Sequence, residues 1–272
     1  MKTWFLLIDP KPLRGSVNMA VDEFLFHTLG ADPRTVLRFY QWERPTASLG
    51  FSQKIQSVVD VAFCRKNGID FVRRMTGGKL VLHHREITYS VVSNDEDAFS
   101  ATLSGSYRLI SQALVTGLER MGVAAVLAGK PPSSYARGTM PCFSYPAQDE
   151  IAVGGRKIIG SAQRRMGRRF LQHGSIPLVV EDDLLKTVSL YPIEGDILMT
   201  SLSREIGAEV DFVWACERLA AGFEDFFGIA FAPLTRTEED DRQIIEIERR
   251  KYANPTWTME GRASQPEDVF SS

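Results

Sequence analysis

The clearest indication of the fold comes from the stretch DEIAVGGRKIIGSAQRRMGRRFLQHGSIPLVV (Asp149–Val180). It contains three runs rich in apolar and branched residues, and glycine stands at each junction, as Gly154-Gly155 and as Gly167. Short glycine-containing junctions between such runs are typical of β-hairpins. Two hairpins in succession make the three strands antiparallel, which favours an α+β fold over a doubly wound parallel sheet.

The segments on either side of these hairpins carry strand and helix patterns. Branched and alternating apolar residues predict strands at 35–42 and 85–92. Helical spacing predicts a helix over residues 16–30, with Ser16 as its cap and Gly30 at its end. Further helices are expected over residues 106–122, 182–191, 211–228 and 238–252. The sequence therefore predicts an α+β fold, a mainly antiparallel sheet flanked by helices.

The 272 residues are long enough for one large domain or two small ones. No linker rich in proline, glycine or serine separates two cores, so we predict a single domain over residues 1–254, with its core at about 32–228. From Pro255 onward the periodicity is lost, and residues 255–272 are expected to form a loose C-terminal tail.

Composition and charge exclude several classes of function. A formal net charge of −2 gives no support to a partner that is a nucleic acid or a membrane surface. The three cysteines, Cys64, Cys142 and Cys216, lie far apart and form no CxxC or Cys/His cluster, which argues against a disulfide framework or a structural zinc site. Only five apolar residues in a row precede Asp9, too few for a signal peptide. We expect a soluble, cytoplasmic protein.

The segment FVRRMTGGKLVLHH (residues 71–84) combines paired glycines with hydrogen-bond donors, which suggests a binding role in addition to a structural one. Its paired glycines, Gly77 and Gly78, allow a close backbone approach, and their N–H groups can cradle an anion or an acyl carbonyl. Hydrogen-bond donors stand at both rims, in Arg73, Arg74, His83 and His84. A lone glycine pair favours the simpler interpretation, which is a β-turn between solvated charges.

The run GGRKIIGSAQRR offers a second candidate. A lysine on a hairpin strand usually points into water, and this is the default for Lys157. Small residues follow it, however, at Gly160, Ser161 and Ala162, where they make room for a ligand or for another backbone. If Lys157 faces inward, its ammonium needs an anionic partner. On the next strand His173, taken alone, is interpreted as a hydrogen-bonded core histidine.

Cys142 lies in the stretch GTMPCFSYP and has two interpretations. Cysteine packs well as a small apolar residue, and that is the default. There is no GxSxG elbow and no HExxH motif, so Cys142 with Lys157 is the most useful reactive pairing. A nearby ammonium favours the thiolate, which can accept an acyl group from a thioester and pass it to an amine. Whether the two residues meet is left open.

Together, RRMTGGKLVLH…ITYSV, PCF, DEI, GRKIIGSAQRR and LQHGSI resemble the lipoate-protein ligase and octanoyltransferase family, which shares a catalytic fold with biotin protein ligases. The resemblance runs from residue 9 to residue 257 and implies a class II biotin/lipoate protein ligase-like catalytic domain. PCF most resembles the octanoyltransferases of that family. They move an octanoyl group from acyl carrier protein to a lysine of a lipoyl-accepting protein, typically the glycine-cleavage H protein. The resemblance implies no metal and no cofactor.

The resemblance also implies site roles. Cys142 forms the octanoyl thioester, while Lys157 favours its thiolate and holds the acyl carbonyl. The implied substrate-binding residues are Arg73, Arg74, Thr76, Gly77, Gly78, His83, Gly160, Ser161, Ala162, His173 and Gly174. Because carrier proteins are typically acidic, the arginines at 164, 165, 168 and 169 are candidates to steer them, and a solvated turn explains them as well.

Two departures from the family pattern affect specificity. Leu80 stands where Gly or Ala is common, and His84 where an acidic residue is common. A leucine at this position is expected to narrow or reshape the acyl tunnel, so the acyl chain preference is open. Three other functions remain open as well: an ATP-dependent lipoate-protein ligase, a lipoyl amidotransferase, and a non-catalytic module that binds a lipoyl domain or an effector.

Overall fold

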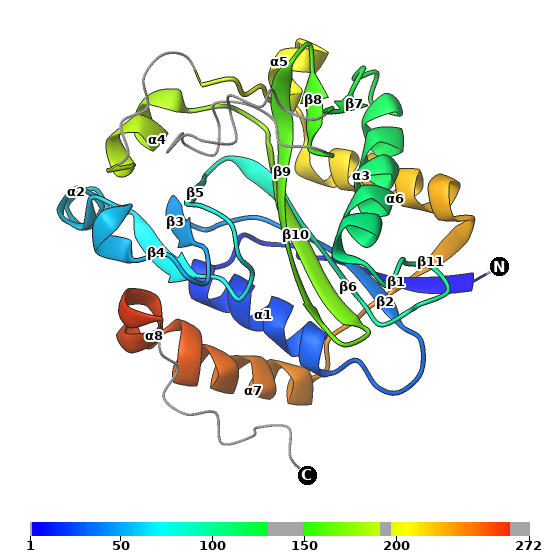
Figure 1. The fold of residues 1–272 in the computed structure, drawn as a ribbon, viewed down its shortest axis with the longest axis horizontal. Coiled ribbons are helices and arrows are strands. Elements are labelled where there is room, and N and C mark those ends of the chain that lie inside the picture. The colour runs from blue at the N-terminus through cyan, green and yellow to red at the C-terminus, as the bar shows by residue number, and fades with distance from the viewer. Residues whose placement is uncertain (1, 130–148, 191–196, 262–272) are drawn as a thin grey trace.

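The computed structural model describes residues 2–129, 149–190 and 197–261. Its largest sheet is built from β1 (Lys2–Ile8), β2 (Thr35–Tyr40), β6 (Glu86–Ser93), β7 (Val126–Leu127), β8 (Ile151–Val153), β9 (Arg156–Met166), β10 (Arg169–Pro177) and β11 (Ile229–Pro233). These strands lie in the order β11-β1-β2-β6-β10-β9-β8-β7 (Figure 1).

The two predicted hairpins are confirmed. β8 and β9 pair antiparallel across the turn at Gly154 and Gly155, and β9 and β10 pair antiparallel across Gly167. Gly167 has φ +57°, a conformation that glycine adopts without strain. β10 then pairs antiparallel with β6, and β6 with β2. β1 pairs parallel with both β2 and β11. This parallel edge was not predicted, because no hairpin marks it in the sequence.

Helices cover both faces of this sheet (Figure 1). On one face pack α3 (Leu103–Glu119) and α6 (Phe212–Phe227), and on the other α1 (Gly15–His27) and α7 (Glu238–Ile247). Successive strand residues point to opposite faces, so Phe39 packs with α3 and α6 whereas Tyr40 packs with α1 and α7. With both faces covered, every residue of β2 and β6 is buried. The predicted α+β architecture is confirmed.

A three-stranded sheet lies beside the large one, in the order β4-β3-β5. Its strands are β3 (Thr46–Leu49), β4 (Asp70–Arg73) and β5 (Val81–His83), and its neighbours are η1 (Ile55–Ser57), α2 (Val61–Lys66) and α4 (Asp182–Val188). Residues 74–80, called the glycine loop here, connect β4 to β5. A Cβ at Gly50 would lie 2.0 Å from the carbonyl oxygen of Gly78, so glycine at position 50 lets the two backbones cross.

The start of the first helix differs from the prediction. α1 begins at Gly15 with Arg14 at its N-cap, and no side chain caps it. The hydroxyl of Ser16 instead donates to Glu248 at 2.6 Å. Glu248 opens the π-helix η3 (Glu248–Tyr252), more than two hundred positions away in the chain, so local sequence rules could not anticipate this contact.

The predicted loose tail does not begin at Pro255. After α5 (Leu202–Ile206), α6, β11, α7 and η3 the chain forms α8 (Pro255–Glu260), capped by the side chain of Asn254. Trp257 on this helix is only 4% exposed. A six-residue helix is too short to show periodicity, and tertiary packing orders it. Residues 262–272 lie outside the described part. None of the helices in the described residues has the length and apolarity to cross a bilayer.

Candidate active site

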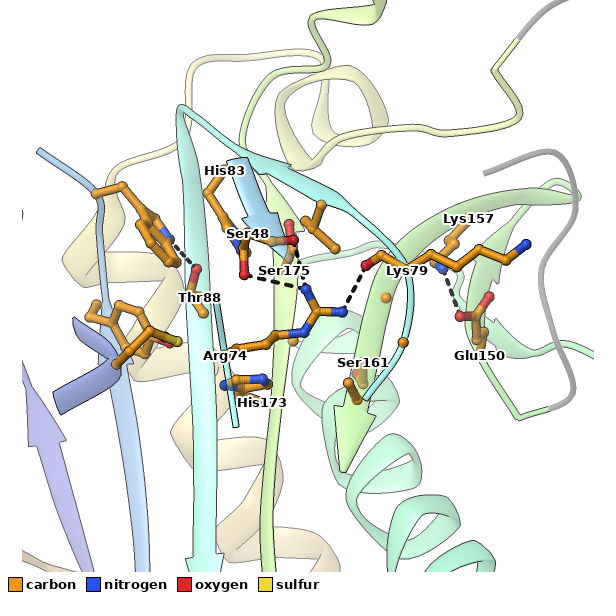
Figure 2. Close-up of a pocket in the computed structure, with 18 of the residues that line it drawn as sticks. Ser48, Arg74, Lys79, His83, Thr88, Glu150, Lys157, Ser161, His173 and Ser175 are labelled. Atoms are coloured by element: carbon orange, nitrogen blue, oxygen red, sulfur yellow. Dashed lines mark hydrogen bonds and ion pairs between the residues drawn. The ribbon is translucent and has the colours of Figure 1, made fainter. Parts of the chain in front are cut away.

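A cavity of about 670 Å³, measured with its open mouth, lies between the β9–β10 hairpin and the glycine loop (Figure 2). Figure 2 shows Lys157 and Glu150 at one end and Thr88 at the other, with Arg74 and His173 between them. The cavity is lined by Met19, Tyr40, Trp42, Ser48, Arg74, Gly78, Lys79, Val81, His83, Thr88, Glu150, Lys157, Gly160, Ser161, Ala162, His173, Gly174, Ser175 and Met199.

Most of the predicted substrate-binding residues meet at this cavity. Those that line it are Arg74, Gly78, His83, Gly160, Ser161, Ala162, His173 and Gly174, together with Lys157. Thr76 and Gly77 belong to the glycine loop but do not line the cavity, and Arg73 lies elsewhere. Cys142 lies outside the described residues.

A bulge in β9 turns Lys157 into the cavity. Ile151 of β8 pairs with Ile159 and the next residue, Ala152, pairs with Lys157, so β9 carries one extra residue at this point. A bulge of this kind re-aims side chains. The Lys157 side chain is 5% exposed, and its Nζ donates to Oε1 of Glu150 at 2.6 Å. The inward orientation and the anionic partner that it requires are therefore both present.

Arg74 determines the shape of the glycine loop. Its guanidinium donates to the carbonyl oxygens of Gly77 (2.9 Å), Lys79 (2.7 Å) and Ser48 (2.8 Å). Gly78 has φ +93°, and a Cβ there would lie 2.8 Å from Nη2 of Arg74. The loop is therefore more than a simple turn between solvated charges, because a buried arginine folds it over the cavity.

His173 connects the glycine loop to α1. Its Nδ1 lies 3.1 Å from Oδ2 of Asp22, and its Nε2 lies 2.7 Å from the hydroxyl of Thr76. Burial lowers the pKa of His173 despite the opposing effect of Asp22. Burial raises the pKa of Asp22, but hydrogen bonds and charge from His173 and Arg38 outweigh it, and the net shift is downward. A neutral ring beside a carboxylate must donate through Nδ1, so Nε2 accepts the proton of Thr76.

A second hydrogen-bonded cluster lies at the end of the cavity opposite Lys157 and Glu150 (Figure 2). Glu86 accepts from the hydroxyls of Thr88 (2.5 Å) and Ser175 (2.6 Å) and lies 2.7 Å from Nδ1 of His83. The rings of His83 and Trp42 stack with centroids 4.0 Å apart. Thr88 also accepts from Nε1 of Trp42 at 2.7 Å. These polar groups satisfy one another's hydrogen-bonding capacity.

The small residues of β9 and β10 fit closely around tyrosine. The hydroxyl of Tyr89 lies 2.7 Å from Oγ of Ser161, and burial raises the pKa of Tyr89 to about 12. A Cβ at Gly174 would lie 2.6 Å from both Oγ of Ser161 and Cε1 of Tyr89. Gly174 is therefore required by packing against β9 and β6.

Arg73 does not line the cavity as predicted. Its buried guanidinium donates to the carbonyl oxygens of Trp257 (3.0 Å) and Thr258 (2.9 Å) on α8. It also binds the carbonyl oxygens of Gly50, Phe51 and Gln53. Arg73 is the last residue of β4 and Arg74 the first of the glycine loop, and successive side chains of an extended chain point to opposite sides, so the two neighbours serve different structures. Arg73 attaches α8 to the small sheet.

Leu80 and His84, the two departures from the family pattern, also point away from the cavity. Leu80 is 6% exposed and packs in the core of the small sheet with Leu49 and Cys64. The expectation that it narrows the acyl tunnel is therefore wrong. Nδ1 of His84 lies 2.5 Å from Oε2 of Glu181, outside this cavity.

The arginines around the β9–β10 turn bind backbone. Arg164 donates to Met75 O (3.1 Å), Arg165 to Ser100 O (2.9 Å), Arg168 to Ala31 O (2.6 Å) and Arg169 to His27 O (3.5 Å). In each of these contacts the guanidinium binds an uncharged carbonyl oxygen. These contacts give the cluster a structural role and leave its positive charge in place.

Several cavity residues were not singled out from the sequence. Met19, Tyr40, Trp42 and Met199 are apolar or aromatic residues of the kind that ordinarily form cores, and nothing local distinguishes them. An acidic partner such as Glu150 could have been predicted, because an inward-facing Lys157 requires an anion nearby. Among the described residues, no three His, Cys, Asp or Glu side chains gather closely enough to hold a metal ion.

Comparison with known proteins connects this geometry to a family. Residues 14–224 match the family described as the lipoyl protein ligase A/B catalytic domain. Octanoyltransferase LipM of Geobacillus kaustophilus is 38% identical over 259 residues, which cover 89% of this chain and 93% of that protein. Octanoyltransferase LipM of Symbiobacterium thermophilum is 36% identical over 274 residues, covering 95% and 99% respectively.

Solved structures share the fold. A T. acidophilum protein with bound lipoic acid superposes with a TM-score of 0.79 at 24% identity, covering 95% of this chain and all of that one. Lipoate-protein ligase A bound with ATP gives a TM-score of 0.81 at 23% identity, covering 96% of this chain and all of that one. At these identities the similarity shows the fold alone. By its match over residues 14–224 and its similarity to the LipM proteins, the chain belongs to the lipoyl protein ligase A/B catalytic domain family.

Proposed function

We propose that this chain is an acyltransferase that moves an octanoyl group from octanoyl-acyl carrier protein to a lysine of a lipoyl-accepting protein, such as the glycine-cleavage H protein. The observation that carries the proposal is the buried Lys157 ammonium at one end of a largely apolar cavity. The similarity to Octanoyltransferase LipM, at 38% identity over nearly the whole chain, supports octanoyl as the group transferred and lipoate biosynthesis as its context.

The cavity has the two properties that an acyl thioester requires. Apolar and aromatic side chains, among them Met19, Tyr40 and Trp42, suit an alkyl chain, which gains free energy by leaving water. The polar end suits the thioester group, because the Lys157 ammonium and the glycine-loop backbone can stabilise the charge that develops on the acyl carbonyl oxygen.

The proposed nucleophile is Cys142, and its role rests on the sequence PCF ahead of GRKIIGSAQ. In the first step the Cys142 sulfur attacks the thioester carbonyl, the bond to the phosphopantetheine sulfur breaks, and that sulfur takes up the proton lost by Cys142. In the second step the ε-amine of the acceptor lysine attacks the Cys142 thioester. An amide forms, the carbon–sulfur bond breaks, and the amine proton returns to Cys142. Neither step needs ATP.

The test is to incubate the purified protein with octanoyl-acyl carrier protein, without ATP, and to measure its intact mass. A hydroxylamine-labile octanoyl adduct is expected, and Cys142→Ser should lack it. Cys64→Ala is the matched control: Cys64 lies in the core of the small sheet, where burial, aided by the charge of Asp60, raises the pKa of its thiol to about 11. That variant should form the adduct like the wild type.

Addition of the H protein to the isolated adduct should then yield octanoyl-lysine and free Cys142. If no adduct forms while ATP and lipoate together label the acceptor, the protein is a lipoate ligase and the proposal is wrong. If lipoyl-H protein serves as the donor and octanoyl-carrier protein does not, the protein is an amidotransferase.

A further inference from the structure

The contact between Glu150 and Lys157 joins two charged groups in a nearly dry position. Their side chains are 12% and 5% exposed, and Oε1 lies 2.6 Å from Nζ. Both residues line the cavity, and in Figure 2 the pair stands at the end opposite Thr88. Glu150 immediately precedes β8, whose hairpin with β9 brings the two residues together.

Each member of a buried ion pair destabilises the folded protein if its partner is removed. A buried ammonium or carboxylate without a counter-ion is strongly unfavourable. The Lys157 chain is confined on its other side as well, because its Cε and Nζ fill the space above Gly160. The carboxylate and the glycine together leave the ammonium little freedom to move within the cavity.

We propose that Glu150 is a positioning residue, a counter-ion that holds the Lys157 ammonium at the cavity and sets the net charge that the acyl donor meets. The inference rests on the proposed function, because it assigns Glu150 a task in the step assisted by Lys157. As long as the carboxylate is in place, it partly offsets the ammonium. The pair therefore presents less net positive charge to an anion in the cavity than the Lys157 ammonium alone would present.

Other titratable groups face the same cavity or lie next to it. Lys79, Arg74, His83 and His173 line it, and Tyr107 of α3 lies close enough for Glu150 to affect it. Burial, then the charge of Tyr89 and of Glu150, raises the pKa of Tyr107. The carboxylate of Glu150 therefore acts on its surroundings beyond Lys157. A test must remove this charge without removing the hydrogen bond.

Glu150→Gln, Glu150→Asp and Glu150→Ala separate charge from position. Glutamine keeps a hydrogen-bond acceptor for Lys157 and removes the negative charge. Aspartate keeps the charge and shortens the reach by one methylene. Alanine removes both. Glu119→Gln, at the exposed end of α3, makes the same change in net charge away from the cavity and serves as the matched control.

The first measurement is the rate of octanoyl adduct formation against pH. In Glu150→Gln the pH at which the rate is half-maximal should fall by about one unit, because removing a negative charge from the cavity eases loss of the thiol proton. Glu150→Asp should keep the wild-type midpoint with a lower plateau, and Glu150→Ala should lose at least tenfold in plateau rate. Glu119→Gln should match the wild type. An unshifted midpoint in Glu150→Gln would overturn the proposal.

The second measurement does not depend on octanoyl transfer. Acetic anhydride acylates only neutral amines, and peptide mass spectrometry reports its reaction with Lys157. The carboxylate holds Nζ at 2.6 Å in a charge-assisted hydrogen bond, which the neutral amide of glutamine replaces only in part, so labelling at neutral pH should rise several-fold in Glu150→Gln. If the wild type forms no adduct, the proposed function fails and this measurement alone decides: equal labelling of wild type and Glu150→Gln rejects the role of Glu150.

Discussion

Lys157 occupies the space that a side chain at Gly160 would need. A Cβ at position 160 would lie 2.6 Å from Cε and 2.9 Å from Nζ of Lys157. The two residues share a face of β9 only because the bulge at this point shifts the alternation of side chains by one residue. Glycine at 160 is thus part of the same arrangement as the ion pair between Lys157 and Glu150.

Gly160→Ala should therefore displace the ammonium. The atoms in the way are the end of a flexible side chain, so the lysine moves and the backbone does not, with a stability cost of about 1–3 kcal/mol at most. The rate of octanoyl adduct formation should fall at least tenfold. Gly30→Ala is the control, because a Cβ there meets nothing within 4 Å. A wild-type rate in Gly160→Ala would show that the position of Lys157 does not matter for the reaction.

His173 should make the stability of the protein depend on pH. Burial lowers its pKa from the usual 6.5, so the folded state remains neutral where the unfolded chain binds a proton. Its contribution is therefore present above pH 6.5 and is lost as pH falls below that value, by at most about 1.4 kcal/mol per pH unit for one proton.

His173→Gln should reduce the loss of unfolding free energy between pH 7 and pH 5, as measured by denaturant titration. Burial also lowers the pKa of His27, which contributes a similar fall to wild type and variant alike. His27→Gln is thus the reference for a histidine outside the cavity. The same slope in His173→Gln and wild type would mean that His173 is not neutral in the folded protein.

Sequence patterns predicted those features that depend on residues close together in the chain. The hairpins that carry Lys157 and His173 follow from glycine turns and alternating strands, and their small residues indicated the cavity. Arg73 and Arg74 are adjacent and look equivalent in the sequence. Their different roles depend on the end of β4 at Arg73 and on the contact of Arg73 with Trp257, 184 positions away.

The incorrect prediction of a loose tail from Pro255 has the same cause, because residues far away in the chain help to order this segment. Trp257 packs beside Phe51 and Tyr252, with ring centroids 5.9 and 6.2 Å away, and its Nε1 donates to the carbonyl oxygen of Arg73 at 2.9 Å. Phe51 and Arg73 come from distant segments of the chain, whereas Tyr252 belongs to the adjoining helix η3. The short sequence around Trp257 contains no pattern that could reveal the distant contacts.

Trp257→Ala should lower the unfolding free energy by about 3–5 kcal/mol, the usual loss for a buried tryptophan. Val213→Ala is the control, because Val213 on α6 is 50% exposed and should cost little when shortened. Denaturant titration of both variants provides the measurement. Equal stability of Trp257→Ala and wild type would restore the prediction that the domain ends at residue 254.

Thr76 links the glycine loop to His173, and two substitutions isolate that link. Thr76→Val keeps the shape and removes the hydroxyl that donates to Nε2 at 2.7 Å, leaving a buried acceptor without its partner. We expect a loss of about 1–3 kcal/mol in unfolding free energy and weaker binding of the acyl donor, because the loop over the cavity is no longer tied to β10. Thr76→Ser retains the hydroxyl and should restore most of both. If Thr76→Val and Thr76→Ser behave alike in denaturant titration and in the concentration dependence of adduct formation, the hydrogen bond to His173 does not hold the loop.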